Sequence, residues 1–302
     1  MTMDGILPLY KDRGMTSHDA VFKCRKIFKT RKVGHSGTLD PNVDGVLPIC
    51  IGKATKVVNY LMESGKIYHG EITLGFATET EDLDGAVVAS QPLSQALSDQ
   101  EIQAAMETLV GDIIQIPPMY SAVKVNGRRL YDYARNGESV DRPKRQIHVD
   151  YFKMQGKSTF DPETGYQKFR FEVGCGKGTY VRTLAVDLGQ KLGLPAVMSD
   201  LTRLKSGGFV IGQAVSLAQL AEMDEAQLEA TLFAPEHAFH DVPQVNLTDS
   251  QWQIVKNGGF LPGNLGLASA QALLFYEQKL RAVYKYDKVR NCFKPEQMID
   301  LT

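Results

Sequence analysis

The stretch Val33-Gly34-His35-Ser36-Gly37-Thr38-Leu39-Asp40-Pro41, followed closely by Gly45-Val46-Leu47-Pro48, surrounds one carboxylate with small, polar and turn-forming residues. Gly34 and Gly37 permit backbone conformations that other residues resist. Thr38 and Asp40 can bond to nearby backbone groups, and Pro41 favours an extended conformation at Asp40. We therefore predict a rigid loop that presents the Asp40 carboxylate. A purely structural turn, with Asp40 bonded to backbone amides, agrees equally well with these residues alone.

A family resemblance separates these two interpretations. Residues 34–52, GHSGTLDPNVDGVLPICIG, resemble the catalytic motif G-H-x-G-T-L-D-P-x-A-x-G-V-L of the TruB-type tRNA pseudouridine synthases. Val43 stands where the family usually has Ala, and Asp44 stands where it has Ser or Thr. Residues 175–182, CGKGTYVR, resemble the second family signature, [CS]-x-K-G-T-Y-[IV]-R, and residues 201–204, LTRL, resemble its L-x-R-[TL] strand. The three motifs follow in the family's order, and the resemblance covers residues 5 to 240.

The composition is ordinary for a globular protein, with 43% apolar and 23% charged residues among 302. This length suits one large domain or a large and a small one. Because the formal net charge is −1, a nucleic-acid site would be a local basic patch. The four cysteines are far apart and no Cys/His cluster has zinc spacing. We therefore expect free thiols in a reducing cytoplasm, no metal or other cofactor, no signal peptide and no membrane partner.

Periodicity and capping signals predict a mixture of strands and helices. Helices are expected from the N-cap Ser17, over 54–62, after the Ser98–Glu101 capping box, and from the second signature to Gly193. Strands are expected over 5–10, 46–51, 68–76, 146–155 and 167–175. The resemblance implies an α+β protein with a mixed, largely antiparallel central sheet flanked by helices, the pseudouridine synthase fold. It also implies a catalytic domain over 1–240 and a small β-rich, PUA-like domain over 241–302.

Two segments concentrate positive charge. The run from Lys23 to Lys32 leads into the Asp40 loop, and it is either a phosphate-contacting surface or an ordinary solvated helix face. Residues 116–145 interleave tyrosines with cations, which suits the base faces and phosphates of RNA; the alternative is an exposed loop anchored by its tyrosines. This second segment resembles the family's RNA-binding thumb, and we expect it to be an open loop with little apolar surface to bury. The acidic run Glu79–Asp84 is interpreted as a solvated turn.

The resemblance implies a role for each matched residue. Asp40 is the nucleophile toward C1′ of the target nucleotide, Tyr68 lies against the base and accepts a proton, and Arg182 pairs with the catalytic carboxylate. The residues implied in substrate binding are His35, Tyr180, Leu201, Lys11, Lys56, Arg203, Arg128 and Arg129. Asp12 replaces the proline of the family's L-x-K-P-x-G motif and puts a negative charge beside Lys11. Taken singly, the tyrosines and Arg182 fit structural roles, but the ordered set of motifs favours catalytic ones.

The implied function is the isomerisation of uridine 55 in the T-arm of tRNA to pseudouridine, after the base is flipped out of its stack. Because an aspartate is ionised at neutral pH and can capture or stabilise C1′, no metal or redox cofactor is needed. One alternative is an RNA-binding protein or tRNA-folding chaperone that does not depend on catalysis. The other is a synthase subunit guided by a separate RNA, which the absence of long lysine-rich extensions disfavours. We expect a cytoplasmic monomer that acts on tRNA without a guide RNA.

Overall fold

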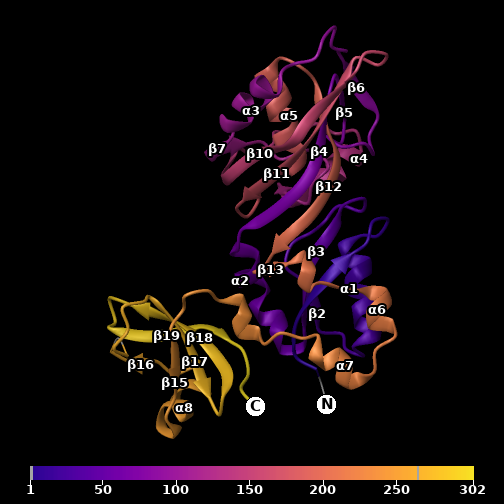
Figure 1. Cartoon of the computed structure of the whole chain (residues 1–302). Helices are drawn as coiled ribbons and strands as arrows, with labels where there is room; N and C mark the ends of the chain where they lie inside the picture. Colours follow the sequence, from indigo (N-terminus) through magenta and orange to yellow (C-terminus); the bar gives the residue numbers. More distant parts are fainter. Residues whose placement is uncertain (1–2, 264) are drawn as a thin grey trace. The chain divides into compact units, whose positions relative to one another are not determined.

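The computed structural model describes residues 3–263 and 265–302. The chain forms two compact units (Figure 1), one made of Met1–Glu63 with Ser206–Thr302 and the other of Ser64–Lys205. The first unit therefore contains both ends of the chain, whereas the second is one continuous segment. A domain boundary after residue 240 stays a prediction.

The first unit contains a small sheet with helices and a separate C-terminal sheet. The small sheet has the order β14-β1-β3, with β14 parallel to β1, β3 antiparallel to β1, and β2 paired with β3. Its elements are β1 (Gly5–Lys11), α1 (Ser17–Ile27), β2 (Val33–His35), β3 (Asp44–Ile51), the 3₁₀ helix η1 (Gly52–Val57), α2 (Val58–Glu63), β13 (Phe209–Val210), η2 (Ile211–Gln213), β14 (Val215–Ser216), α6 (Leu217–Ala221), α7 (Glu225–Ala230) and η3 (Pro235–Ala238).

Helix α1 begins one residue earlier than predicted. Its N-cap is Thr16, whose hydroxyl accepts from the Asp19 amide while the Asp19 carboxylate accepts from the Thr16 amide. This reciprocal capping box satisfies two backbone donors that a helix start leaves without partners. The predicted cap, Ser17, is instead buried and bonds to the Asp40 loop through Leu39.

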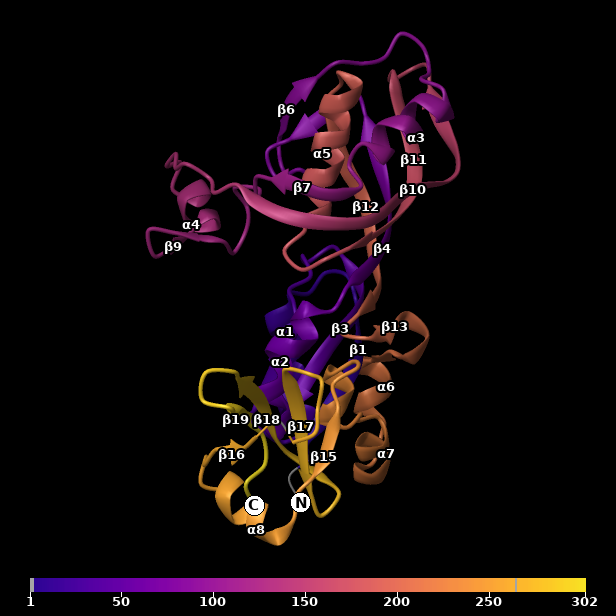
Figure 2. The ribbon, with the colours of Figure 1, turned by 90° about the vertical axis from the view of Figure 1, so that its left-hand side faces the viewer.

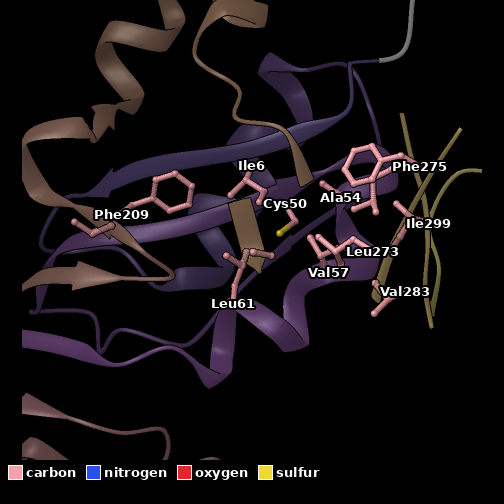
Figure 3. Packing of buried hydrophobic residues seen from close by; sticks show 13 residues of the cluster. Ile6, Cys50, Ala54, Val57, Leu61, Phe209, Leu273, Phe275, Val283 and Ile299 are labelled. Carbon is pink, nitrogen blue, oxygen red and sulfur yellow. The ribbon is translucent and has the colours of Figure 1, made fainter. Parts of the chain in front are cut away.

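The C-terminal sheet has the order β15-β17-β18-β19-β16. Side chains alternate across β17, so that Ala272 and Leu274 lie in one core and Leu273 and Phe275 in another. The second of these cores includes residues of η1 and α2 such as Val57 (Figure 3), which joins the C-terminal sheet to the N-terminal part of the unit. The elements are β15 (Gln244–Asn246), α8 (Asp249–Val255), β16 (Leu261–Pro262), β17 (Gln271–Tyr276), β18 (Lys279–Asp287) and β19 (Cys292–Met298).

The second unit is built on strands in the order β12-β4-β11-β10-β7, and neighbouring strands in this order are antiparallel. Helices α3 and α5 contact each other, and α3 also contacts β10. The Ser98–Glu101 capping box at the start of α3 is confirmed, and α5 ends at Gly193, whose φ of +70° is a left-handed conformation that glycine adopts readily. The elements are β4 (Lys66–Leu74), β5 (Phe76–Thr78), β6 (Val87–Ser90), α3 (Asp99–Glu107), β7 (Gly111–Gln115), β8 (Lys124–Val125), β9 (Arg128–Arg129), α4 (Leu130–Arg135), β10 (Arg145–Asp161), β11 (Tyr166–Cys175), α5 (Val181–Leu192) and β12 (Ala196–Ser206).

The segment 116–145 has more structure than predicted. Strands β8 and β9 form a hairpin whose turn residues Asn126 and Gly127 have φ of +51° and +82°, the combination that tight two-residue hairpins require. Val123, Leu130 and Tyr133 are buried. The expectation of an open loop with little apolar surface to bury is therefore wrong, because these side chains form a small core under the hairpin and α4. Figure 2 shows α4 and β9 projecting away from the sheet of their own unit.

The predicted fold class is confirmed, since both units mix helices with mainly antiparallel strands. Burial raises the pKa of Cys24 and Cys50 to about 12 and that of Cys175 to about 11. These buried thiols are therefore unreactive at neutral pH. Among the described residues, no helix has the length and apolar character that crossing a membrane requires.

Candidate functional site

The Asp40 loop is fixed by contacts on both sides of the carboxylate. The Ser17 hydroxyl accepts from the Leu39 amide at 2.9 Å and donates to the Leu39 carbonyl at 3.1 Å. The Pro41 carbonyl accepts from the Gly14 amide at 2.9 Å and from the Lys11 ammonium at 3.1 Å. The Asp40 carbonyl accepts from the Val43 amide, closing a turn with proline in its second position. Asp40 itself is half-buried, which agrees with the predicted rigid loop that presents one carboxylate.

The two departures from the family motif contribute to this loop. Val43 is buried. The Asp44 carboxylate accepts from the Tyr10 hydroxyl at 2.7 Å and from the Arg13 guanidinium at 3.2 Å. The bond to Asp44 is the main cause that raises the pKa of Tyr10 to about 12. Asp44 therefore ties the end of β1 to the start of β3, a structural role.

Three predicted substrate contacts belong to the first unit. Lys11 is fully buried, and its ammonium also donates to the carbonyls of Asp12 and Met15. These bonds, with the one to Pro41, give Lys11 a structural role in the Asp40 loop. His35 ends β2, and its Nδ1 accepts from the Gly37 amide at 3.3 Å. Gly37 has a φ of +128°, which explains the glycine. Lys56 in η1 donates to the Ile299 carbonyl at 3.0 Å.

The second unit places Tyr68, Leu201 and Arg203 on adjacent strands. Tyr68 on β4 lies opposite Arg203 on β12, and Leu201 lies opposite Gly70. All three side chains are buried or nearly so, with exposed fractions of 7% for Tyr68, 6% for Leu201 and 1% for Arg203. Burial of an arginine to this extent is rare without partners. The strand pairing therefore brings an aromatic ring, an apolar side chain and a cation together on one part of the sheet.

Tyr180 and Arg182 stand at the start of α5. Tyr180 is the N-cap residue, half-buried, with φ −98° and ψ 110°. Arg182 is 6% exposed and its guanidinium donates to the Thr80 carbonyl at 2.8 Å and to the Tyr120 carbonyl at 3.0 Å. The Asp82 carboxylate lies 3.6 Å from the same guanidinium. The planar fork of arginine suits several fixed acceptors at once, so this side chain is held in one orientation.

The acidic run Glu79–Asp84 is a turn, as the sequence favoured, but it is solvated only in part: Glu79 and Asp84 are exposed, whereas Glu81 and Asp82 are half-buried. Besides the ion pair of Asp82, the half-buried Glu81 carboxylate accepts from the Thr183 hydroxyl at 2.6 Å. Burial is the largest influence on Glu81 and raises its pKa. Glu81 also has a φ of +66°, an uncommon conformation for a residue other than glycine. Asp82 is thus a residue of the site that sequence reasoning missed, and only the crowding of acids beside a strand end signalled it.

The cations of residues 116–145 differ in their surroundings. Arg128 makes two bonds to the Glu138 carboxylate, at 2.8 and 3.1 Å, and lies 4.3 Å from the centroid of the Tyr133 ring. Arg129 is exposed. The neighbouring Arg142 donates to the Pro117 carbonyl at 3.1 Å and so connects the two ends of the segment. Both Arg128 and Arg129 therefore lie on the exposed surface of the hairpin.

A basic hollow lies at the end of α1. It is lined by Phe22, Arg25, Lys26, Lys29, Thr30 and Arg31. Phe22 is 55% exposed, and the Lys26 ammonium lies 4.7 Å from the centroid of its ring. An exposed aromatic ring among cations suits the base faces and phosphates of RNA. This arrangement favours the phosphate-contacting interpretation of the Lys23–Lys32 run over a simple solvated face.

Each unit thus supplies one set of reactive groups. The first unit presents a carboxylate on a fixed loop, and a carboxylate can attack or stabilise an electron-poor carbon. The second unit presents two tyrosines and a fixed guanidinium, which can exchange protons and bind oxyanions. Within residues 3–263 and 265–302, no three His, Cys, Asp or Glu side chains gather where they would hold a metal ion.

Comparisons with known proteins agree with the motifs. The family model for the TruB family pseudouridylate synthase N-terminal domain matches residues 25–181, and that for the tRNA pseudouridylate synthase B C-terminal domain matches residues 182–240. The tRNA pseudouridine synthase B of Ligilactobacillus salivarius (strain UCC118) is 62% identical, over 99% of this chain and 100% of the relative. The protein of the same name from Latilactobacillus sakei subsp. sakei (strain 23K) is 57% identical, over 98% of this chain and 97% of the relative.

Solved structures extend the similarity to the fold. A chain of the Cbf5-Nop10-Gar1 complex is 27% identical with a TM-score of 0.74, over 98% of this chain and 85% of that chain. A chain of the archaeal box H/ACA sRNP Nop10-Cbf5 complex is 24% identical with a TM-score of 0.71, over 99% of this chain and 87% of that chain. The second similarity concerns the fold alone.

Proposed function

The chain belongs to the TruB family of pseudouridylate synthases, and from that premise we propose that it converts uridine 55 in the T-arm of tRNA to pseudouridine. The observation that carries the proposal is the 62% identity, over nearly the full length, to a relative named tRNA pseudouridine synthase B. That relationship makes the chain a pseudouridine synthase that modifies tRNA. The choice of uridine within tRNA, and the roles of the residues, are the parts that we propose.

The proposed reaction begins at the sugar of a flipped-out nucleotide. The bond between N1 and C1′ breaks and its electron pair stays with the uracil, while the Asp40 carboxylate captures or stabilises C1′. The uracil then rotates, and its C5 forms a bond to C1′ as Asp40 is released. The proton on C5 leaves to a base, for which we propose Tyr68, and N1 takes up a proton. Atoms and charge balance without a cofactor, since the product is an isomer of the substrate.

The remaining residues would hold the nucleotide and its RNA. We propose that Arg182 pairs with Asp40, that Tyr180 and Leu201 flank the base, and that His35 supports the flipped-out loop. The fixed orientation of Arg182, held by the Thr80 and Tyr120 carbonyls, supports a role that depends on direction. We propose further that Lys11, Lys56 and Arg203 lie near the site or the RNA backbone, and that Arg128 and Arg129 contact the RNA.

We also propose that the protein works in the cytoplasm as a monomer without a guide RNA. The relatives named tRNA pseudouridine synthase B match nearly the whole chain, and their name supports tRNA as the substrate. The Cbf5 complexes contain further proteins and are far less similar in sequence. The basic hollow on α1 and the projecting hairpin of residues 116–145 give this chain two surfaces of its own for tRNA.

A tritium-release assay on unmodified tRNA tests the proposal. Because C5 loses its hydrogen when it bonds to C1′, a transcript labelled at C5 of uridine releases tritium as pseudouridine forms. We expect release from the wild-type transcript and none above background from a matched transcript with cytidine at position 55. Release from both transcripts would contradict the proposed target. Tight binding without release would favour the alternative of an RNA-binding protein or chaperone.

A further inference from the structure

Gln115 is a buried glutamine whose side-chain amide makes two hydrogen bonds to the main chain at the start of α5. It is the last residue of β7, is 2% exposed, and directly precedes the segment 116–145. Its Oε1 accepts from the Tyr180 amide at 2.8 Å, and its Nε2 donates to the Tyr180 carbonyl at 3.1 Å. The Asp187 carboxylate, further along α5, is also close to this amide, which acts to lower the pKa of Asp187 although burial raises it overall. Both the oxygen and the nitrogen of the Gln115 side-chain amide therefore have hydrogen-bond partners.

The two bonds to Tyr180 fall where a helix start leaves the main chain without partners. As N-cap residue, Tyr180 has an amide outside the helical bonding pattern, and its own side chain makes no capping bond. Its carbonyl accepts from the Leu184 amide at 3.1 Å, the first bond of the helix, and Gln115 occupies the second acceptor direction of that carbonyl. Because both peptide groups flanking the Tyr180 Cα are held, the direction in which its side chain leaves the backbone is fixed.

We propose that Gln115 is a positioning residue for Tyr180 and thereby for the base being isomerised, an inference that rests on the proposed role of Tyr180 beside that base. Gln115 touches no reacting atom. It sets the orientation of Tyr180 through the main chain, by its two bonds to the Tyr180 amide and carbonyl.

A second contact from the same stretch supports this assignment. Five residues after Gln115, the Tyr120 carbonyl accepts from the Arg182 guanidinium at 3.0 Å. The stretch that leads from β7 into the hairpin segment therefore holds Tyr180 through its main chain and Arg182 through its side chain. A change at Gln115 shifts the support of both residues of the second signature, whereas the reacting groups themselves stay chemically intact.

The chain offers a closely matched control in Gln167. This glutamine is also in the second unit, is 0% exposed, accepts from the Leu97 amide at 2.8 Å and donates to the Leu97 carbonyl at 2.8 Å. A third partner, the Ser158 hydroxyl, takes the place that Asp187 has at Gln115. Gln115→Leu and Gln167→Leu thus remove the same pair of bonds to a main chain from the same kind of buried site. Only Gln115 acts on a residue of the proposed site.

The experiment measures the single-turnover rate of tritium release and the Kd for T-arm RNA in the wild type and both variants. For Gln115→Leu we expect a rate about 10- to 100-fold lower, since small misplacements of catalytic groups cost this much, and a Kd within about threefold of wild type. For Gln167→Leu we expect both quantities to stay within about threefold. Equal rates in the two variants would overturn the inference, and so would a Gln115→Leu effect confined to Kd. An inactive wild type would instead contradict the proposed function.

A second substitution keeps the inference testable if Gln115→Leu does not fold. Gln115→Glu keeps an acceptor for the Tyr180 amide, but an ionised glutamate has no donor for the Tyr180 carbonyl. The new carboxylate also lies close to that of Asp187, and Lys191 is the nearby cation. We expect the single-turnover rate of Gln115→Glu relative to wild type to be lower at pH 8 than at pH 6, because burial and the neighbouring Asp187 carboxylate both raise the pKa of the introduced glutamate and favour its neutral, donating form as the pH falls. A rate ratio to wild type that does not change between pH 6 and pH 8 would contradict the positioning role.

Discussion

Arg182 shows at the scale of single residues how main-chain groups orient a reactive side chain. Two carbonyls, those of Thr80 and Tyr120, accept from its two terminal nitrogens, and Asp82 adds charge at 3.6 Å. The sequence signature identified Arg182 because the arginine belongs to a motif. It did not identify Asp82 or Gln115, because the fold alone brings these residues to α5. Asp82 and Gln115 belong to no motif, and nothing in the sequence around them distinguishes them from surface residues.

Arg182→Lys should reduce the single-turnover rate about 100-fold while RNA affinity changes by less than about fivefold. A lysine ammonium is a compact charge without the planar fork of arginine, so it cannot present two parallel N–H groups to a carboxylate while its other donors stay fixed on the Thr80 and Tyr120 carbonyls. The measurement is tritium release at saturating enzyme together with filter binding. Arg170→Lys, at an exposed arginine of β11, is the control and should leave both quantities unchanged. A rate within threefold of wild type for Arg182→Lys would remove this arginine from the site.

Asp187→Asn should change how stability depends on pH. Burial raises the pKa of Asp187 to about 6 from its ordinary value of 3.8. Between these values the folded state holds a proton that the unfolded state has released, so the wild type loses stability as the pH rises from about 4 to 6. The asparagine cannot lose a proton. The stability of the variant relative to wild type should therefore increase across this window and level off near pH 7, as measured by urea unfolding.

Asp99→Asn is the control of opposite sign. Bonds from Ser158 lower the pKa of Asp99, so its charged form stabilises the folded state and that contribution is lost as the pH falls. The stability of this variant relative to wild type should decrease as the pH rises from about 3 to 5. Parallel trends for the two variants would contradict the burial of Asp187.

At the scale of elements, each strand and helix that the sequence predicted lies within a few residues of an observed one, because the signals of long elements are local, whereas many short strands were not predicted. The capping box of α3 and the alternation in β4 are examples. The hairpin in residues 116–145 was not predicted, although its Asn126-Gly127 turn is a local signal. The burial of Val123 and Leu130 depends on tertiary contacts that no repeated pattern indicates. The Asp40 loop was predicted as rigid from its turn residues, but the source of that rigidity, Ser17 on α1, is invisible in the motif itself.

Ser17→Ala should destabilise the Asp40 loop and slow the reaction. It removes a buried hydroxyl that makes two bonds to Leu39 and leaves the Leu39 amide without that acceptor, a loss of about 1–3 kcal/mol. We expect a lower midpoint of thermal unfolding and a single-turnover rate at least about tenfold lower. Ser98→Ala, which removes an exposed helix cap worth about 1 kcal/mol, is the control. It should lower the midpoint but not the rate, and equal rate losses would contradict the role of Ser17.

At the scale of the whole molecule, a net charge of −1 conceals strongly uneven charge. The hollow on α1 gathers cations around Phe22, whereas Arg128 on the hairpin is already bonded to Glu138. The sequence indicated both basic segments, Lys23–Lys32 and 116–145, but it did not indicate that Arg128 is paired with an acidic residue. The C-terminal strands were likewise expected as a small domain over 241–302, yet one of their cores includes Val57 and Leu61 from the N-terminal part of the chain. Contacts between distant parts of a chain leave little trace in composition.

RNA binding should depend steeply on salt, and the hollow should account for a measurable part of the slope. Each phosphate contact contributes roughly 0.7–0.9 to the slope of log K against log salt. Lys26→Ala with Arg31→Ala should therefore reduce the slope by about 1.5. The control pair, Lys157→Ala with Lys168→Ala, removes the same charge from exposed positions of β10 and β11 and should leave the slope unchanged. Equal reductions would mean that net charge, not the hollow, determines binding.

The most direct measurement of the central claim is the single-turnover rate of Asp40→Asn on tRNA labelled at C5 of uridine. Asparagine preserves the size of the side chain but is a poor nucleophile, so we predict a loss of at least about 1,000-fold with little change in Kd. Asp44→Asn changes the second carboxylate of the same turn, which bonds to Tyr10 and Arg13, and should keep most of the activity. Pseudouridine formation by Asp40→Asn at a rate similar to that of Asp44→Asn would contradict the assignment of Asp40 as the nucleophile.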